Sequence, residues 1–179
     1  MARIQPLAIE AADPTTAATL QAVKTKIGMV PNLFATLARA PAALNGYLAL
    51  SDALSKGRLS ARQREIVALT VAQANQCQYC LSAHTLIGKG AGLSDDAIRD
   101  ARAGKSSDPQ DHAIAVLASK LLKQQGNLSQ AELNTAHAAG IDDGLVLEIV
   151  VNVAFNVLTN YTNHVAETDI DFPVVQMVL

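Results

Sequence analysis

The sequence predicts an all-α protein, and three observations support that prediction. Apolar residues recur at helical spacing, as Ile66, Leu69 and Ala72 do in "REIVALTVA". Helix-starting residues (Ser, Asp, Asp-Pro) and helix-stopping glycines bound most segments. No segment alternates apolar and polar residues before a hairpin turn. The length of 179 residues, with 50% hydrophobic and 17% charged residues, fits one well-buried domain.

Helix signals bound four segments in the first 76 residues. The segments read "DPTTAATLQAVKTKIG", "VPNLFATLARAP", "PAALNGYLALSDALSKG" and "LSARQREIVALTVAQANQ". In the first, Asp13 is placed to cap the helix, Pro14 suits the first helical position, and Gly28 is the stop. In the fourth, Ser60 is the expected N-cap. Each segment therefore predicts one helix.

Four further helices are expected after the two cysteines. Their segments read "AGLSDDAIRDARAG", "DPQDHAIAVLASKLLKQQGN", "LSQAELNTAHAAG" and "IDDGLVLEIVVNVAFNVLTNYTNHV". Ser94 caps the first of them, and Gly104 stops it. The last segment is rich in valine, which suits a buried strand by propensity, but its length favours a buried helix.

The domain organisation follows from the same signals. "AGLSDDAI" and "AGIDDGLV" share a pattern that fits either a duplicated helical unit or the ordinary stop-and-cap residues between helices. The tail "TDIDFPVVQMVL" contains Pro173 and lacks a helical pattern, so we expect it to lie across a neighbouring surface. We predict a single domain over residues 1–179, with a core at about 20–165 and a tail at 166–179.

Charge and hydropathy exclude several classes of function. The net charge is −2 and no basic stripe is present, which argues against nucleic-acid binding. The most apolar run, Leu145 to Leu158, contains Glu148, Asn152 and Asn156 and is shorter than the about 20 residues of a membrane span. The N-terminus lacks a secretory pattern, so we expect a cytoplasmic protein. The apolar composition also suggests an oligomer interface.

The two cysteines of the chain lie three positions apart in "ANQCQYCLSAH". In a cytoplasmic protein such a pair is more often catalytic or metal-binding than a structural crosslink. On a continuous helix, Cys77, Cys80 and His84 would fall within an arc of about 60°, because each residue turns about 100°. A disulfide between Cys77 and Cys80 is feasible if a helix begins there.

A reactive thiol at this position needs a proton acceptor. A helix N-terminus favours a nearby anion by only about 0.3–1 kcal/mol, so it does not ionise Cys77 unaided. His84, one turn after Cys80, is a candidate base, and Glu65, on the preceding helix, could relay a proton or orient the imidazole. The helix N-terminus favours attack by Cys77, whereas contact with His84 favours Cys80, and this reasoning leaves both open.

Non-redox alternatives use the same side chains. Haem attachment requires a histidine directly after the second cysteine, where this chain has Leu81. Zinc requires four ligands, which Cys77, Cys80, His84 and Glu65 could just supply. However, structural zinc cysteines normally sit on turns, and no second cysteine pair exists. We therefore expect no metal, and a non-redox metal- or ligand-binding helical module is the alternative.

The complete pattern Glu65-x11-Cys77-Gln78-Tyr79-Cys80-x3-His84 resembles the alkylhydroperoxidase D family, which belongs with the carboxymuconolactone decarboxylases. The segments "VPN", "LS..R" and "NHV..TDIDFP" are similar to its peroxidase-related branch, so the resemblance covers roughly residues 20 to 173. It implies an all-α, often internally duplicated fold that forms trimers or hexamers. It also implies an enzyme that reduces hydroperoxides with thiols.

The resemblance further implies roles for individual residues. Cys80 would be the peroxidatic thiol, Cys77 would resolve its sulfenic acid to a disulfide, and Glu65 and His84 would carry protons. No cofactor would be bound, but an external thiol or dithiol donor, lipoyl- or thioredoxin-like, would be needed. Tyr79 stands where the best-known members have histidine, and a phenol of pKa near 10 is no base at neutral pH. A carboxymuconolactone decarboxylase-like activity is a further alternative, although that branch lacks the cysteine pair.

Two further sets of residues are candidates for the walls of a cavity. Polar residues recur every four positions in the last predicted helix, from Glu148 to His164, and their ordinary role is to satisfy neighbouring helix ends or to face solvent. Among them, His164 is the best candidate for the thiol cavity, together with Tyr79. Phe34, Leu37 and Leu81 could line an apolar pocket for an organic peroxide. Each of these is more often plain core.

Overall fold

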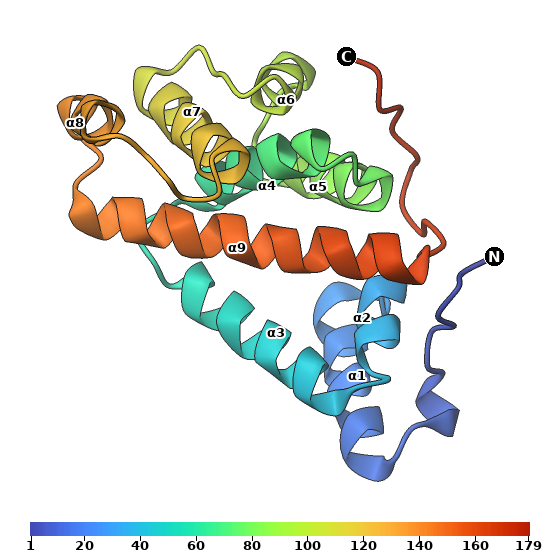
Figure 1. Cartoon of the computed structure of the whole chain (residues 1–179). Helices are drawn as coiled ribbons and strands as arrows, with labels where there is room; N and C mark the ends of the chain where they lie inside the picture. Colours follow the sequence, from blue (N-terminus) through green and yellow to red (C-terminus); the bar gives the residue numbers. More distant parts are fainter.

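Nine α-helices and one short 3-10 helix form the fold in the computed structural model, which describes residues 1–179 (Figure 1). The elements are η1 (Ile9–Ala11), α1 (Pro14–Ile27), α2 (Asn32–Leu37), α3 (Pro41–Ser55), α4 (Ala61–Ala74), α5 (Gln78–Gly90), α6 (Asp95–Arg102), α7 (Pro109–Lys123), α8 (Gln130–Ala138) and α9 (Asp143–Ala166). The all-α prediction is confirmed, and the valine-rich last segment is a helix of 24 residues.

Helix α9 runs through the middle of the molecule (Figure 1). Helices α1 to α3 lie on one side of it, and α4 to α8 lie on the other. Helix α4 packs against α5, α6, α7 and α9, so it is the centre of the second group. This arrangement brings α5, which begins directly after Cys77 and contains Cys80, against α9.

Two hydrophobic clusters meet at α4. Its residues Ile66 and Leu69 belong to a cluster that also contains both cysteines and residues of α1, α2 and α3. Its residues Val67 and Val71 belong to the other cluster, which α7, α8 and α9 complete. Apolar residues on both sides of one helix are the pattern of a helix that is buried all round.

The helix ends follow local capping chemistry. Asp13 accepts hydrogen bonds from the backbone N–H groups of Thr15 and Thr16, and Gly28 ends α1 in the left-handed conformation with φ of 90°. Ser60 and Gln63 form a reciprocal capping box at the start of α4. These bonds satisfy N–H groups that have no partner inside the helix.

The polar positions of α9 are mostly buried and bonded. Glu148 accepts hydrogen bonds from the backbone N–H groups of Arg58 and Leu59 at 2.9 and 2.8 Å, which holds the loop before α4. Asn160 accepts one from Asn75 Nδ2, at the end of α4, at 2.9 Å. By length and mean hydropathy, 1.4 over 18 residues, α9 could cross a membrane, but buried core helices pass the same test.

The outward face of α9 carries an apolar stripe. Its members alternate three and four residues apart and are all exposed: Leu147, Val151, Ala154, Leu158, Tyr161 and Val165. This is the spacing of a seam that packs against another helix. No element of the chain covers the stripe.

The C-terminal residues after α9 cross the surface of α4, α5 and α6. Gln73, Gln78 and Arg102 donate hydrogen bonds to the main-chain oxygens of Met177, Val175 and Gln176 at 2.9, 3.2 and 2.9 Å. The Val175 N–H donates to Ser82 Oγ on α5 at 3.0 Å. The tail is therefore held through its backbone, next to the helix that bears the cysteines.

Candidate active site

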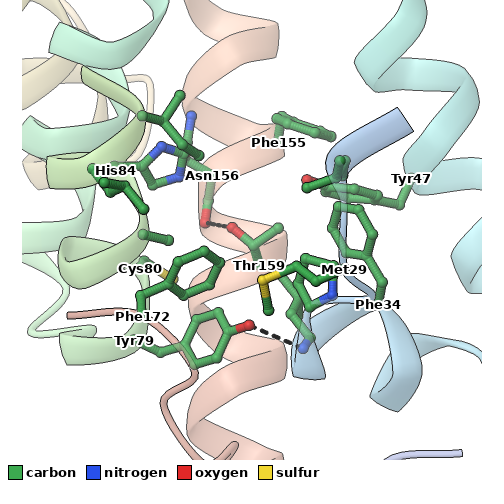
Figure 2. A pocket seen from close by; sticks show the side chains of 16 residues that line it. Met29, Phe34, Tyr47, Tyr79, Cys80, His84, Phe155, Asn156, Thr159 and Phe172 are labelled. Atoms are coloured by element: carbon green, nitrogen blue, oxygen red, sulfur yellow. Dashed lines mark hydrogen bonds between the residues drawn. The ribbon is translucent and has the colours of Figure 1, made fainter. Parts of the chain in front are cut away.

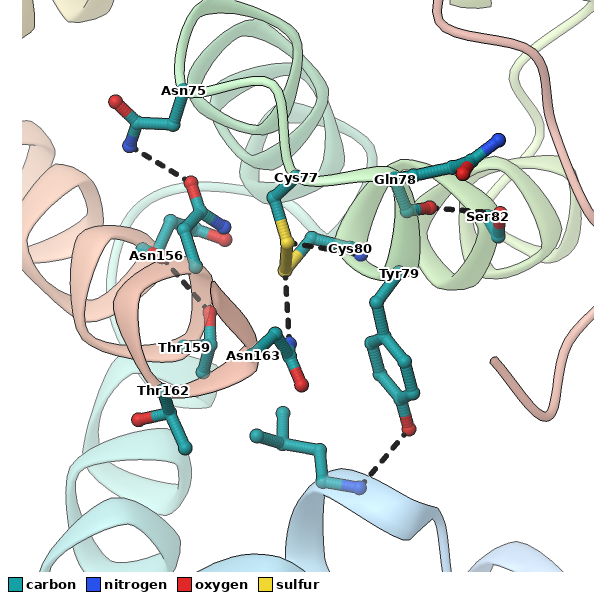
Figure 3. Close-up of a disulfide and its surroundings, with 12 residues drawn as sticks. Asn75, Cys77, Gln78, Tyr79, Cys80, Ser82, Asn156, Thr159, Thr162 and Asn163 are labelled. Carbon is teal, nitrogen blue, oxygen red and sulfur yellow. Dashed lines mark hydrogen bonds between the residues drawn. A yellow bond between two sulfur atoms is a disulfide. The ribbon is translucent and has the colours of Figure 1, made fainter. Parts of the chain in front are cut away.

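A sharp turn places Cys77 at the start of α5. Gln76 adopts the left-handed conformation, with φ of 56°, and the next residue, Cys77, is the N-cap of the helix. Its Sγ accepts a hydrogen bond from the backbone N–H of Cys80 at 3.3 Å (Figure 3). A sulfur in this position faces the positive end of the helix, which favours a thiolate.

Cys77 and Cys80 are joined by a disulfide, with their Cα atoms 5.3 Å apart. Both residues are buried, with 1% and 2% of their surface exposed. One difference from the sequence-based geometry matters. Cys77 lies before the helix rather than on it, so it does not share the face of Cys80 and His84.

Asn163 of α9 contacts the other sulfur. Its Nδ2 donates a hydrogen bond to Cys80 Sγ at 3.2 Å, and the residue is buried (Figure 3). A donor aimed at a sulfur stabilises the thiolate once the disulfide is opened. Sequence reasoning missed this residue, because the four-residue series selected its neighbour His164.

Glu65 and His84 come together as expected from their spacing. Glu65 Oε2 on α4 lies 2.8 Å from His84 Nδ1 on α5, and both side chains are largely buried. A carboxylate can only accept, so Nδ1 carries a proton, and in the neutral ring Nε2 is the nitrogen with the free lone pair. The arrangement orients the imidazole as a base with a defined tautomer.

Cys80 and His84 both line an apolar cavity of about 260 Å³ between α5, α9, α2 and α3 (Figure 2). The chain has only three phenylalanines, three tyrosines and no tryptophan. Five of these six aromatic residues line this cavity: Phe34, Tyr47, Tyr79, Phe155 and Phe172. The rings of Tyr47 and Phe155 stack with centroids 4.7 Å apart. The cavity is lined by neither lysine nor arginine, so it fits a neutral apolar molecule.

Glu65 stands behind His84 with respect to this cavity. It does not line the apolar cavity but borders, together with His84, an adjacent cavity of about 220 Å³ that also touches Arg64. His84 therefore lies between the two spaces. A proton taken up on the Cys80 side can be balanced by the carboxylate on the other side of the ring.

Tyr79, between the two cysteines, connects α5 to other parts of the fold. Its hydroxyl accepts a hydrogen bond from the Leu33 N–H at the start of α2, 3.1 Å away, and its ring meets Phe172 edge-on at 5.6 Å. Burial raises the pKa of Tyr79 well above that of a free phenol, and the Asp171 carboxylate adds to the rise. The phenol stays protonated and links α5 to α2 and to the tail.

A second, polar hollow of about 500 Å³ opens on the opposite side of the disulfide. Cys77 lines it, and so do His164, Asn163 and Thr168 near the end of α9. The structure thus places His164 beside Cys77 and outside the apolar cavity that holds Cys80. Two buried atoms here, Asn163 Oδ1 and Thr168 Oγ1, have no hydrogen-bond partner.

The remaining sequence candidates divide between cavity and core. Phe34 lines the apolar cavity, whereas Leu37 and Leu81 do not and are packed in the hydrophobic cluster around the cysteines. Asn156, from the polar series of α9, also lines the cavity and donates to the Asn152 backbone oxygen. No group of three or more Cys, His, Asp and Glu side chains is arranged to hold a metal ion.

Comparison with known proteins agrees with this fold. Residues 37–124 match the model of the carboxymuconolactone decarboxylase family. A crystal structure of an uncharacterised peroxidase-related protein from Ralstonia eutropha JMP134, described as an alkylhydroperoxidase AhpD core, has a TM-score of 0.86 and 25% identity. That likeness covers 95% of this chain and 92% of the other.

Two further solved structures share the fold. A peroxidase-related protein from Silicibacter sp. TM1040 has a TM-score of 0.81 at 22% identity, over 93% of this chain and 91% of the other. The debrominase Bmp8, solved with 2,3,4-tribromopyrrole, has a TM-score of 0.78 at 16% identity, over 94% and 91%. No curated protein matches the sequence. Residues 37–124 of the chain thus match the carboxymuconolactone decarboxylase family, and the chain has the AhpD-like, all-α fold of peroxidase-related proteins.

Proposed function

We propose that this protein reduces organic hydroperoxides with its Cys77–Cys80 thiol pair. The observation that carries the proposal is the position of Cys80. It is one of a disulfide-forming pair, it receives a hydrogen bond from Asn163, and it opens on the cavity that His84 also lines. A thiol, a base and an apolar cavity at one point are what attack on an organic peroxide requires.

The chemistry balances in two steps. In the reduced protein, Cys80 gives its proton to His84 Nε2, and the thiolate attacks one peroxide oxygen. The O–O bond breaks, Cys80 becomes a sulfenic acid, and the alkoxide takes the proton from His84 and leaves as an alcohol. Cys77 then attacks the sulfenic sulfur, which releases water and closes the disulfide. One peroxide and two thiols therefore give one alcohol, one water and one disulfide.

The cavity also indicates which peroxides fit. Five aromatic side chains and neither lysine nor arginine line it, so an aryl or alkyl hydroperoxide should bind better than hydrogen peroxide. Each methylene group that an apolar pocket contacts changes discrimination by about 10- to 200-fold. The same lining argues against a decarboxylase, because a carboxylate substrate needs a cation or several donors.

The test is thiol titration of reduced protein before and after cumene hydroperoxide, with mass spectrometry to locate the products. We expect two thiols to be lost per peroxide in the wild type. The Cys77→Ser variant should stop at a sulfenic acid on Cys80, and Cys80→Ser should consume no peroxide. Removal of the base in His84→Gln should slow the oxidation by about 100-fold or more. His137→Gln, a change on α8 away from the cavity, is the matched control. Undiminished peroxide consumption by Cys80→Ser would refute the proposal.

A further inference from the structure

The two sulfurs of the disulfide face different spaces. Cys80 lines the apolar cavity and is absent from the polar hollow, whereas Cys77 lines the polar hollow and is absent from the apolar cavity. Tyr79 borders both and separates them. Figure 3 shows the disulfide between α5 and Asn163 of α9, with the Tyr79 ring beside it. One disulfide therefore borders two spaces with different chemistry.

We propose that the thiol that reduces the disulfide binds in the polar hollow and attacks Cys77, while the peroxide approaches Cys80 through the apolar cavity. This inference rests on the proposed function. It assigns the hollow, which has no other role, as the binding site of a reductant. It also separates the oxidising from the reducing substrate, so neither has to leave before the other binds.

Unpartnered polar atoms point to a ligand in the hollow. Asn163 and Thr168 are 4% and 8% exposed, and both line the hollow. Asn163 Oδ1 and Thr168 Oγ1 have no hydrogen-bond partner. A buried polar atom without a partner is destabilising, and a bound hydrogen-bond donor removes that cost. Asn163 Oδ1 can only accept and Thr168 Oγ1 can accept, so a reductant with an N–H or O–H group near its sulfur matches these two residues.

The end of α9 builds this site. Glu167 adopts the left-handed conformation, with φ of 47°, and the Thr168 N–H donates to the Asn163 backbone oxygen at 3.2 Å. This turn brings Thr168 back alongside Asn163 and His164. Glu167 lines the hollow, and no lysine or arginine does. A dithiol that has hydrogen-bond donors and no negative charge is therefore the class of reductant that fits.

The reaction is an ordinary thiol–disulfide exchange. The incoming thiol gives its proton to His164, and its thiolate bonds to Cys77 Sγ as the S–S bond breaks. Cys80 leaves as a thiolate, which the hydrogen bond from Asn163 Nδ2 stabilises. The second thiol of the reductant then attacks the reductant sulfur that is bonded to Cys77. The reductant closes to a disulfide, and Cys77 is released and takes up the proton of that thiol. Two electrons pass from dithiol to protein, and Cys80 is again ready for peroxide.

The half-reactions can be measured separately by rapid quenching with an alkylating agent and mass analysis. Oxidised protein is mixed with dithiothreitol, and reduced protein is mixed with cumene hydroperoxide. We expect Thr168→Val and His164→Gln to slow reduction about tenfold and to leave oxidation unchanged. Thr162→Val and His137→Gln make the same chemical changes outside the hollow and should alter neither rate. Circular dichroism verifies that each variant is folded.

A matched pair of reductants tests the hydrogen bonds directly. Butane-1,4-dithiol is dithiothreitol without its two hydroxyl groups. We expect dithiothreitol to reduce the wild type faster than butane-1,4-dithiol does. The ratio of the two reduction rates should fall by at least threefold in Thr168→Val. With the monothiol cysteamine, the trapped mixed disulfide should be on Cys77. A mixed disulfide on Cys80, or equal slowing of both half-reactions, would overturn the inference. Failure of peroxide to oxidise the thiols would instead refute the proposed function, because reduction by dithiothreitol is measured independently.

Discussion

Replacement of Tyr79 by phenylalanine removes one buried hydroxyl and keeps the ring. The Leu33 N–H then loses its acceptor, 3.1 Å away in the wild type, and Leu33 is only 6% exposed. An unsatisfied buried donor costs about 1–3 kcal/mol. The ring volume and the edge-on contact with Phe172 are unchanged, so no cavity contributes. We therefore expect Tyr79→Phe to lower the free energy of unfolding by about 1–3 kcal/mol at pH 8.

The same substitution changes the alkaline behaviour. Burial raises the pKa of Tyr79, so above pH 10 the unfolded chain releases this proton and the folded chain keeps it. The stability contribution is complete below pH 10 and falls by about 1.4 kcal/mol for each pH unit above it. Tyr47, whose pKa is also raised by burial, adds a similar loss that remains in the variant. The difference in free energy of unfolding between wild type and Tyr79→Phe should therefore be smaller by about 1.4 kcal/mol at pH 11 than at pH 8.

Guanidinium unfolding followed by far-ultraviolet circular dichroism measures both effects, since the chain has no tryptophan. Tyr161→Phe, at an exposed position of α9, is the control and should change neither value. Because the Tyr79 phenol stays protonated, Tyr79→Phe should keep its peroxidase rate within about threefold of the wild type. Wild-type stability in Tyr79→Phe would refute the structural role. A folded variant that loses more than tenfold in rate would show that the phenol takes part in the chemistry.

Three other predictions concern stability and assembly. Asp111 is buried and accepts a hydrogen bond from Arg62 at 3.0 Å. Asp111→Ala should therefore lower the free energy of unfolding by about 1.5–3 kcal/mol, and an unchanged midpoint in denaturant would contradict this. The Arg58 hydrogen bond lowers the pKa of Asp142 to about 2. The ionised Asp142 therefore stabilises the folded state above pH 4, and this contribution is lost as the pH falls to 2. Asp142→Asn should therefore show a shallower loss of stability between pH 5 and 2. Leu158 lies in the exposed stripe of α9, and we expect Leu158→Arg to convert an oligomer to a monomer in light scattering; a monomeric wild type would refute this.

The helix boundaries could be predicted because they depend on neighbouring residues. Asp13 and Ser60 cap helices at the predicted positions, since each side chain bonds backbone N–H groups within three residues. The contact between Glu65 and His84 could also be predicted, because the two residues lie on consecutive helices that pack together. Local chemistry and short connections were sufficient for these features.

Long-range contacts were not predictable in the same way. Phe172 and Phe155 reach the apolar cavity from the tail and from α9, which no local pattern indicates. The scarcity of aromatic residues is the one signal that could have grouped them. Asn163 was missed for a different reason. The side chains of adjacent helical residues point in directions about 100° apart. Asn163 therefore reaches Cys80, whereas its neighbour His164 lines the hollow beside Cys77.

The C-terminal tail is held by its backbone, but it lines the apolar cavity with a side chain. Hydrogen bonds from side chains of α4, α5 and α6 hold its main-chain oxygens, which every amino acid offers. Phe172, by contrast, presents its side chain to the cavity. Substitutions of Phe172 can therefore widen or narrow the apolar cavity while the backbone hydrogen bonds of the tail remain. Phe172 is therefore the residue of the tail at which a substitution changes the lining of the cavity directly.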